Sequence, residues 1–237
     1  MEAKIRVYKA VDEIDTSLRF VDGHRKMLEA YGVAKVTSAG ESWIEDPDTY
    51  VIIAESCDDQ RILGGTRIQI RTPAMKLPME DAIAKVDKNI YGYVDRIGDY
   101  NVAEFCGLFN SKEVAGYGIG SMFLGRVAIA ISSQIGVKYL LGLCSPATLR
   151  NSARVGFDIL RDLGVNGKFY YPKEGLIATS LIIDDLDNLP NADPHERERI
   201  FDLRRNPSQR TLEKGPKGAL EITYEINVVQ EYEKRFA

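Results

Sequence analysis

Apolar residues recur at spacings of two in some segments and of three or four in others, which predicts a chain of strands and helices. Thr16 or Ser17 is expected to cap the first helix, which runs to about Ala30 and has Gly32 beyond it. Strands are predicted over residues 4–9, 50–56, 61–71, 100–109, 138–144, 167–172 and 176–184. Further helices are predicted over residues 79–91, 119–135 and 147–157.

The segment 185–217 has a different character. It holds four of the nine prolines and the charged run HERERIFDLRR at 195–205, which predicts one short amphipathic surface helix. Residues 219–229 alternate again and predict a strand that rejoins the main sheet. We therefore expect a domain over residues 1–184 and a C-terminal extension over residues 185–237.

Three glycines, Gly116, Gly118 and Gly120, lie between a predicted strand and an amphipathic helix. Glycine allows a tight turn and lets a ligand approach the backbone closely. The free N–H groups of the first helical turn and the helix dipole then favour an anion, and a pyrophosphate suits such a turn. The same spacing also fits a flexible turn that precedes a helix.

Two other phosphate-binding motifs do not fit. A Walker A loop requires a lysine after its last glycine, and Ser121 follows Gly120 here. A dinucleotide-binding fingerprint opens a parallel βαβ unit and has an acidic residue about 20 positions further on. The strands before this turn are predicted as antiparallel hairpins, and Leu140 occupies the acidic position.

The order of elements resembles the GNAT N-acyltransferase superfamily, and the segment that begins at Ala115 looks like its acyl-CoA-binding motif. The motif glycines match Gly118 and Gly120, whereas Ala115 stands where the family has Gln or Arg. The resemblance covers about residues 50–184. It implies an α/β (α+β) GNAT fold with a mixed, mostly antiparallel central sheet flanked by helices. It also implies an acyl-CoA or acetyl-CoA donor, held by the residues of the glycine turn: Ala115, Gly116, Tyr117, Gly118, Ile119, Gly120 and Ser121.

The helix after this motif resembles the family as well. Asn151 and the Gly156-Phe157 pair match, and Asn151 is an expected cofactor contact. Ala153 occupies the position of the family's tyrosine acid, which leaves the general acid unidentified. The strand end from Leu108 to Asn110 is expected to pair with the amide-rich pantetheine arm as an added strand.

A narrower resemblance concerns residues 62–78, which look like a signature of the acyl-homoserine-lactone synthases, a branch with the GNAT fold. Arg67 matches the arginine of that signature, and Glu45 and Asp48 resemble its upstream acidic pair, which implies that they bind substrate. Glu104 matches the glutamate of a Glu-x-x-Arg motif, and Gly107 replaces the arginine. Autoinducer synthesis is therefore an alternative function.

Acyl transfer from a thioester to an amine needs a base and a donor to the tetrahedral oxyanion. Glu104 stands in an apolar strand, where desolvation raises a carboxyl pKa toward neutrality and suits a general base. The alternative is a structural carboxylate paired with Arg67. A backbone N–H near Cys106 to Leu108 is the expected oxyanion donor, and Gly107 would allow the bulge that frees it.

The remaining candidate side chains are explained at least as well by a structural role as by a functional one. Cys106 and Cys144 are expected to be buried core residues, because neither histidine lies nearby in the sequence. His24 is expected to be solvated on the first helix. The acidic group at 45–48 fits a solvated turn or recognition of a cationic amine. Trp43 either packs at a core edge or lines a substrate pocket.

Composition narrows the function classes. The 237 residues, with 44% apolar residues and a formal net charge of -4, fit one large globular domain and argue against a general nucleic-acid binder. Three scattered cysteines form neither a disulfide framework nor a metal site, which suits the cytoplasm. We read no signal peptide and no apolar run long enough to span a membrane.

The leading hypothesis is an N-acyltransferase that uses acyl-CoA or acyl carrier protein and a small-molecule amine. An acidic carrier protein could dock at 195–205, where Arg204 and Arg205 end the run. The departures at Ala115 and Ala153 motivate a third hypothesis, a non-catalytic ligand-binding module. A homodimer is compatible with the sequence.

Overall fold

The computed structural model describes residues 2–33 and 36–228, and these form one 10-stranded sheet. The strand order is β6-β8-β5-β4-β3-β2-β1-β10-β9, and β7 pairs with β8 beside this path. The strands are β1 (Glu2–Lys9), β2 (Thr49–Ser56), β3 (Ile62–Ile70), β4 (Val102–Asn110), β5 (Tyr139–Cys144), β6 (Asp158–Ile159), β7 (Lys168–Tyr170), β8 (Ile177–Ile183), β9 (Ser208–Gly215) and β10 (Gly218–Glu225).

The helices are α1 (Ile14–Ala30), α2 (Pro78–Ile83), α3 (Asn89–Ile97), α4 (Leu124–Ser132), α5 (Pro146–Arg154) and α6 (Pro194–Arg205). Short turns of helix include η1 (Ala10–Asp12), η2 (Thr37–Ala39), η3 (Ser42–Glu45), η4 (Lys112–Val114) and η5 (Ile119–Phe123). None of the helices in the described residues combines the length and the apolar character needed to cross a bilayer.

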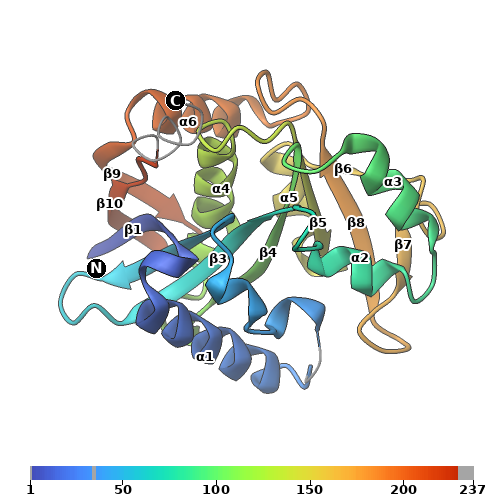
Figure 1. Ribbon diagram of the computed structural model, residues 1–237. Coiled ribbons are helices and arrows are strands. Elements are labelled where there is room, and N and C mark those ends of the chain that lie inside the picture. The colour runs from blue at the N-terminus through green and yellow to red at the C-terminus, as the bar shows by residue number, and fades with distance from the viewer. Residues whose placement is uncertain (1, 34–35, 229–237) are drawn as a thin grey trace.

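The sheet is mixed. Most neighbouring strands are antiparallel, while β4 with β5 and β1 with β10 are parallel. Helices α1, α2 and α3 cover one face, and α4 and α5 cover the other, with α6 packed on α4 (Figure 1). The predicted fold class, a mixed and mostly antiparallel sheet flanked by helices, is confirmed.

Helix α4 supplies the centre of the largest core. Val127, Ala128 and Ile131 are fully buried against the sheet, because apolar residues recur on its inner face every three to four positions. The prediction of one helix over 119–135 needs correction at both ends. The first turn, η5, is a π-helix, and α4 ends at Ser132.

Two other predicted helices differ in detail. The span 79–91 is divided between α2 and α3, which pack as separate short helices. The first helix begins at Ile14, so neither Thr16 nor Ser17 caps it. The Thr16 hydroxyl instead donates to Glu13 Oε2 at 2.9 Å.

The C-terminal part of the chain completes the sheet. Besides α6, the segment 185–217 contains β9, a strand that the pattern did not predict. The predicted last strand is present as β10 and pairs in parallel with β1, although residue 229 lies outside the described residues. Arg126 of α4 ties this region to the core, because its buried guanidinium donates to Glu196 of α6 and to Glu213 of β9.

Candidate active site

Strands β4 and β5 run in parallel and then part. Their paired residues extend from Val102–Tyr139 to Phe105–Gly142. Beyond that point β4 continues to Asn110, which still pairs with Gly64 of β3 on its other edge. The edge of β4 that faces β5 is therefore unpaired over residues 106–110, and an extended ligand can add to it as a strand.

A β-bulge interrupts β4 beside this opening. Arg67 pairs with Cys106 and Gly65 with Phe109, so that two β4 residues oppose one residue of β3. Gly107 has a φ of +67°, in the left-handed region that favours glycine. The bulge expected at Gly107 is therefore present. Its role in binding an oxyanion stays a prediction.

The glycine turn lies at the start of η5. Gly118 has a φ of +98° and caps the helix, and a Cβ built on Gly120 would lie 2.2 Å from Asn110 Oδ1. Close packing against β4 therefore requires glycine at position 120. In the described part of the chain, the N–H groups of Ile119, Gly120 and Ser121 have no hydrogen-bond acceptor. Three free amides at a helix start favour an anion.

A small cavity joins the unpaired edge of β4, the glycine turn and α5. Its lining includes the predicted cofactor contacts Leu108, Gly120, Ser121 and Asn151. The other residues predicted to hold the cofactor at this turn do not line the cavity. The Gly116 carbonyl accepts a hydrogen bond from Lys217 N at 2.9 Å, Tyr117 packs on Gly215, and Ile119 is buried in the core; Ala115 ends the short turn η4.

Glu104 lies on the other face of β4, under α2. The side chain is 2% exposed, and its Oε2 accepts a hydrogen bond from the backbone N–H of Met79 at 2.7 Å. Burial raises the pKa of Glu104 to about 8, although the Met79 hydrogen bond and the charge of Arg67 both favour the ionised form. A carboxyl with this pKa can accept a proton near neutral pH.

Among the described residues, Arg67 heads the largest side chains that are fully buried. It is 1% exposed, its guanidinium lies 4.6 Å from the centre of the Trp43 ring, and Nη1 donates to the Ser38 carbonyl at 2.9 Å. No ion pair joins it to Glu104 within the described residues, so the pairing with Arg67 that the structural alternative named is absent there. Whether Glu104 is a base or a structural carboxylate stays a prediction.

No protein-family model matches the chain, and no curated protein matches its sequence. Solved structures do match. FeeM, an N-acyl amino acid synthase from uncultured soil microbes, aligns with a TM-score of 0.61 and 16% identity over 83% of this chain and 98% of that chain. BjaI, a CoA-dependent acyl-homoserine lactone synthase solved with SAM and isopentyl-CoA, aligns with a TM-score of 0.54 and 14% identity over 84% of this chain and 90% of that chain.

An acyl-CoA N-acyltransferase from Pseudomonas aeruginosa aligns with a TM-score of 0.53 and 10% identity over 76% of this chain and 99% of that chain. The chain has the GNAT fold. The resemblance in fold to acyl-homoserine-lactone synthases is also confirmed, and at these identities the likeness concerns the fold alone.

The acidic residues predicted to bind substrate are not brought together in this GNAT fold. Glu45 is exposed at the end of η3. Asp48 is buried before β2, where its carbonyl accepts a hydrogen bond from Ile70 N at 3.1 Å. Trp43, in contrast, is buried and stacks on Arg67, which unites the two predicted substrate contacts from different elements.

Tyr171 is a partly buried tyrosine near Glu104 that the sequence did not single out. The residue follows β7, and its hydroxyl accepts a hydrogen bond from Thr37 N and lies 2.9 Å from Thr37 Oγ1. Burial raises the pKa of Tyr171, and the nearby charge of Glu104 adds to this effect. No local pattern marks the pair, because 134 residues separate Thr37 from Tyr171.

The prediction that His24 is solvated is wrong. The ring is 6% exposed and packs against Phe20 and Phe109, with ring centres 6.3 and 5.9 Å away. Burial lowers the pKa of His24 to about 4, and the charge of Arg67 acts in the same direction. The polar sequence around His24 suggested contact with solvent, but η3 and the end of β4 cover this part of α1.

The structure also places the two cysteines and the two arginines of α6 for which the sequence allowed predictions. Cys106 is buried as predicted, and burial raises the pKa of its thiol to about 12, which disfavours a nucleophile. Cys144 is only partly buried. Arg204 is half-buried, and its Nη2 donates to the Leu186 carbonyl at 2.7 Å. A carrier-protein dock at 195–205 stays a prediction. Arg205 remains exposed.

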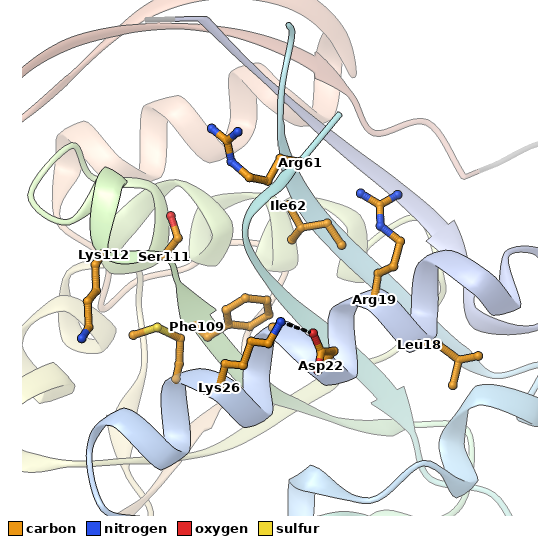
Figure 2. Close-up of a pocket in the computed structure, with 11 residues that line it drawn as sticks. Leu18, Arg19, Asp22, Lys26, Arg61, Ile62, Phe109, Ser111 and Lys112 are labelled. Atoms are coloured by element: carbon orange, nitrogen blue, oxygen red, sulfur yellow. Dashed lines mark ion pairs between the residues drawn. The ribbon is translucent and has the colours of Figure 1, made fainter. Parts of the chain in front are cut away.

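A second and larger cavity, about 580 Å³, opens on the α1 face. Phe109 forms part of its wall, and Lys26 pairs with Asp22 at 2.6 Å on the rim (Figure 2). Leu108 lines the smaller cavity, so consecutive residues of β4 contribute to cavities on opposite faces of the sheet. The sequence did not predict this pocket, because its lining comes from α1, β3 and β4.

Proposed function

We propose that the protein is an N-acyltransferase that transfers an acyl group from a CoA thioester to an amine. One observation carries the proposal: the unpaired edge of β4, three free backbone amides at a helix start, and α5 border a single cavity. The free amides suit the diphosphate of the coenzyme, and the unpaired edge suits the pantetheine arm. The GNAT fold supports the same assignment.

The proposed chemistry uses both faces of β4. The amine nitrogen bonds to the thioester carbonyl carbon, and the carbon–sulfur bond breaks when the tetrahedral intermediate collapses. Glu104 accepts the amine proton, and the departing CoA thiolate takes up a proton. Backbone N–H groups at the Gly107 bulge stabilise the oxyanion, which is worth about 3 kcal/mol per donor in acyl-transfer enzymes.

The assignment of individual contacts belongs to this proposal. Glu104 and Gly107 act in catalysis, and Arg67 with Trp43 contacts the acceptor. Leu108, Asn110 and Asn151 line the path of the carrier. The diphosphate lies over the turn from Gly116 to Ser121, which lacks a basic first residue because position 115 is Ala. We also infer a cytoplasmic site of action, since all three cysteines are free.

Binding and turnover of acyl-CoA test the proposal. Calorimetric titration with CoA, acetyl-CoA, octanoyl-CoA and palmitoyl-CoA should give saturable binding for at least one of them. Release of free thiol should then accelerate when an amine acceptor is added. Absence of binding to all four ligands would remove the proposal. Binding without turnover for any amine would favour the non-catalytic module, and release of thiol only with an acylated carrier protein would identify that protein as the donor.

Synthesis of acyl-homoserine lactones is a second candidate. The signature at residues 62–78 and the stacking of Arg67 on Trp43 favour it. Gly107 opposes it, because it stands where that branch has an arginine. Mass spectrometry of extracts from expressing cells decides the matter, and extracts without lactones would remove this candidate while leaving the broader activity intact.

A further inference from the structure

The larger cavity, here called the α1-face cavity, has an apolar wall. Leu18 and Met27 of α1 contribute to this wall, together with Ile62 of β3 and Phe109 of β4. Leu18 is 45% exposed, so part of the wall is apolar surface in contact with water. The volume of about 580 Å³ falls within the range of small-molecule sites. An apolar chain that enters the cavity removes this surface from water, which favours binding.

Positive charge collects around the same cavity. Its lining contains four cationic side chains and one acid: Arg19, Lys26, Arg61, Lys112 and Asp22. All four cations are exposed, so they stand at the rim and not in the wall. The whole chain has a formal net charge of -4, so the sign of this surface is opposite to that of the protein as a whole. A surface of this sign attracts anions.

Two of the four cations are neutralised by neighbouring acids. Lys26 pairs with Asp22 at 2.6 Å on α1. Arg61 pairs with Asp59 and with Glu113, the latter at 3.1 Å. The positive charge that is available to a ligand therefore comes from the other two cations.

Those two cations, Arg19 and Lys112, have no carboxylate partner within residues 2–33 and 36–228. Arg19 donates through Nη2 to the Gln60 carbonyl at 2.6 Å, a contact that positions the guanidinium without neutralising it. The two side chains come from α1 and η4, and Figure 2 shows them on opposite sides of the Phe109 ring. An anion at either side of the apolar wall therefore meets an unneutralised cation.

We propose that the α1-face cavity binds a single-chain anionic amphiphile, a molecule with one apolar chain and a carboxylate or phosphate head. The chain lies along the apolar wall, and the head lies at the rim beside Arg19 or Lys112. A neutral chain would leave the charge of the rim without a partner, and a small anion would leave the wall in water. A mostly apolar lining with a few placed polar groups is typical of small-molecule sites.

The α1-face cavity is separate from the cavity assigned to the coenzyme. Phe109 lines the first and Leu108 lines the second, on opposite faces of the sheet, and the two cavities share no lining residue. The inference therefore does not depend on the proposed acyl transfer. It also implies that the amphiphile and CoA bind to the protein at the same time.

Calorimetric titration of the full chain with octanoate, octyl phosphate, octanol and octyltrimethylammonium tests the proposal. At least one of the two anions should bind with one-to-one stoichiometry and about fivefold more tightly than octanol, with the ammonium compound weakest. The affinity for fatty acids should rise by up to about fourfold per methylene from hexanoate to decanoate. The tighter of octanoate and octyl phosphate identifies the head group.

Substitutions at the rim locate the binding. Arg19→Gln and Lys112→Gln each remove one unneutralised charge at an exposed position, so both variants should fold. The variant that lacks the cation beside the head should weaken the anion by about two- to fivefold and leave octanol unchanged. Leu18→Gln should weaken the anion and octanol alike. Arg210→Gln is the charge-matched control, because this exposed arginine lies on β9 outside the cavity, and it should bind both ligands as the wild type does.

Titration of octanoate and octyl phosphate in the presence of saturating CoA separates the two cavities. Unchanged affinity for the anion supports a site on the α1 face. Displacement by CoA would place the chain in the coenzyme cavity and overturn the inference. Equal affinities for the anions and octanol, or wild-type affinity in both Arg19→Gln and Lys112→Gln, would also overturn it. If CoA itself does not bind, the proposed function is removed, and the rim variants still decide this inference.

Discussion

Arg67 and Glu104 share one face of neighbouring strands and form no ion pair with each other within residues 2–33 and 36–228. Gln69, not Arg67, stands opposite Glu104 in the register. The charge of Arg67 is near enough to lower the pKa of Glu104, yet burial outweighs it and leaves that pKa at about 8. A tight ion pair would have kept the carboxylate ionised and a weak base. Burial thus raises the pKa of Glu104, and the lack of an ion pair with Arg67 leaves that rise in place.

The first prediction concerns pH. Because a base works in its ionised form, kcat/KM should rise as the pH increases through about 8 and level off above it. Glu104→Gln preserves the shape and an acceptor for the Met79 N–H, and it should lower kcat by about 10²–10⁴-fold and abolish the rise. Rates from pH 6 to 9.5 provide the measurement. A variant with wild-type turnover at every pH would show that another group takes the proton.

The second prediction concerns the glycine turn. A Cβ at Gly120 would lie 2.2 Å from Asn110 Oδ1, so Gly120→Ala must displace either the turn or the Asn110 side chain. Affinity for CoA should fall by at least about tenfold, equal to 1.4 kcal/mol, as titration calorimetry would detect.

Gly92→Ala is the matched control for this change. Gly92 lies inside α3, and the nearest atom to its added Cβ would be Arg96 Nη1 at 4.0 Å. The control should leave CoA affinity unchanged and stabilise the protein by about 0.5–1 kcal/mol through helix propensity. Equal affinities of the two variants for CoA would contradict a diphosphate site at the turn.

The third prediction concerns stability in acid. His24 has a folded pKa of about 4, below its ordinary value of 6.5, so the unfolded chain binds a proton at pH values where the folded protein does not. The contribution of neutral His24 to the free energy of unfolding is complete above pH 6.5 and is lost as the pH falls toward 4. The loss should amount to roughly 2–4 kcal/mol.

Urea unfolding at several pH values between 7 and 4.5 measures this loss. His24→Leu should lose less free energy of unfolding than the wild type as the pH falls over that window, since no imidazole remains to be protonated at the site. His195→Gln removes the exposed imidazole of α6 and should retain the slope of the wild type. If both variants follow the wild-type curve, the acid sensitivity arises elsewhere.

The sequence predicted a residue's burial or backbone conformation correctly where these depend on its neighbours along the chain. The apolar strand around Glu104 predicted its burial, and burial accounts for its raised pKa. The glycine spacing predicted the turn at Gly118, because positive φ and a free helix start depend on a few adjacent residues. The bulge at Gly107 was predicted for the same reason.

Errors arose where distant segments decide the environment. His24 has polar neighbours in sequence, and only the packing of Phe109 and η3 on α1 removes it from water. Strand β9 was missed because its exposed residues alternate weakly, and its pairing with β10 makes it a strand.

The sequence by itself determined most of the elements, the glycine turn and the placing of an acid in an apolar strand, since these follow from periodicities of two to four residues. Tertiary structure alone decided that β4 and β5 part beside that turn, that Trp43 stacks on Arg67, and that Tyr171 meets Thr37. Such contacts join residues far apart in the chain. Their geometry depends on how the sheet and its helices pack, which no local pattern specifies.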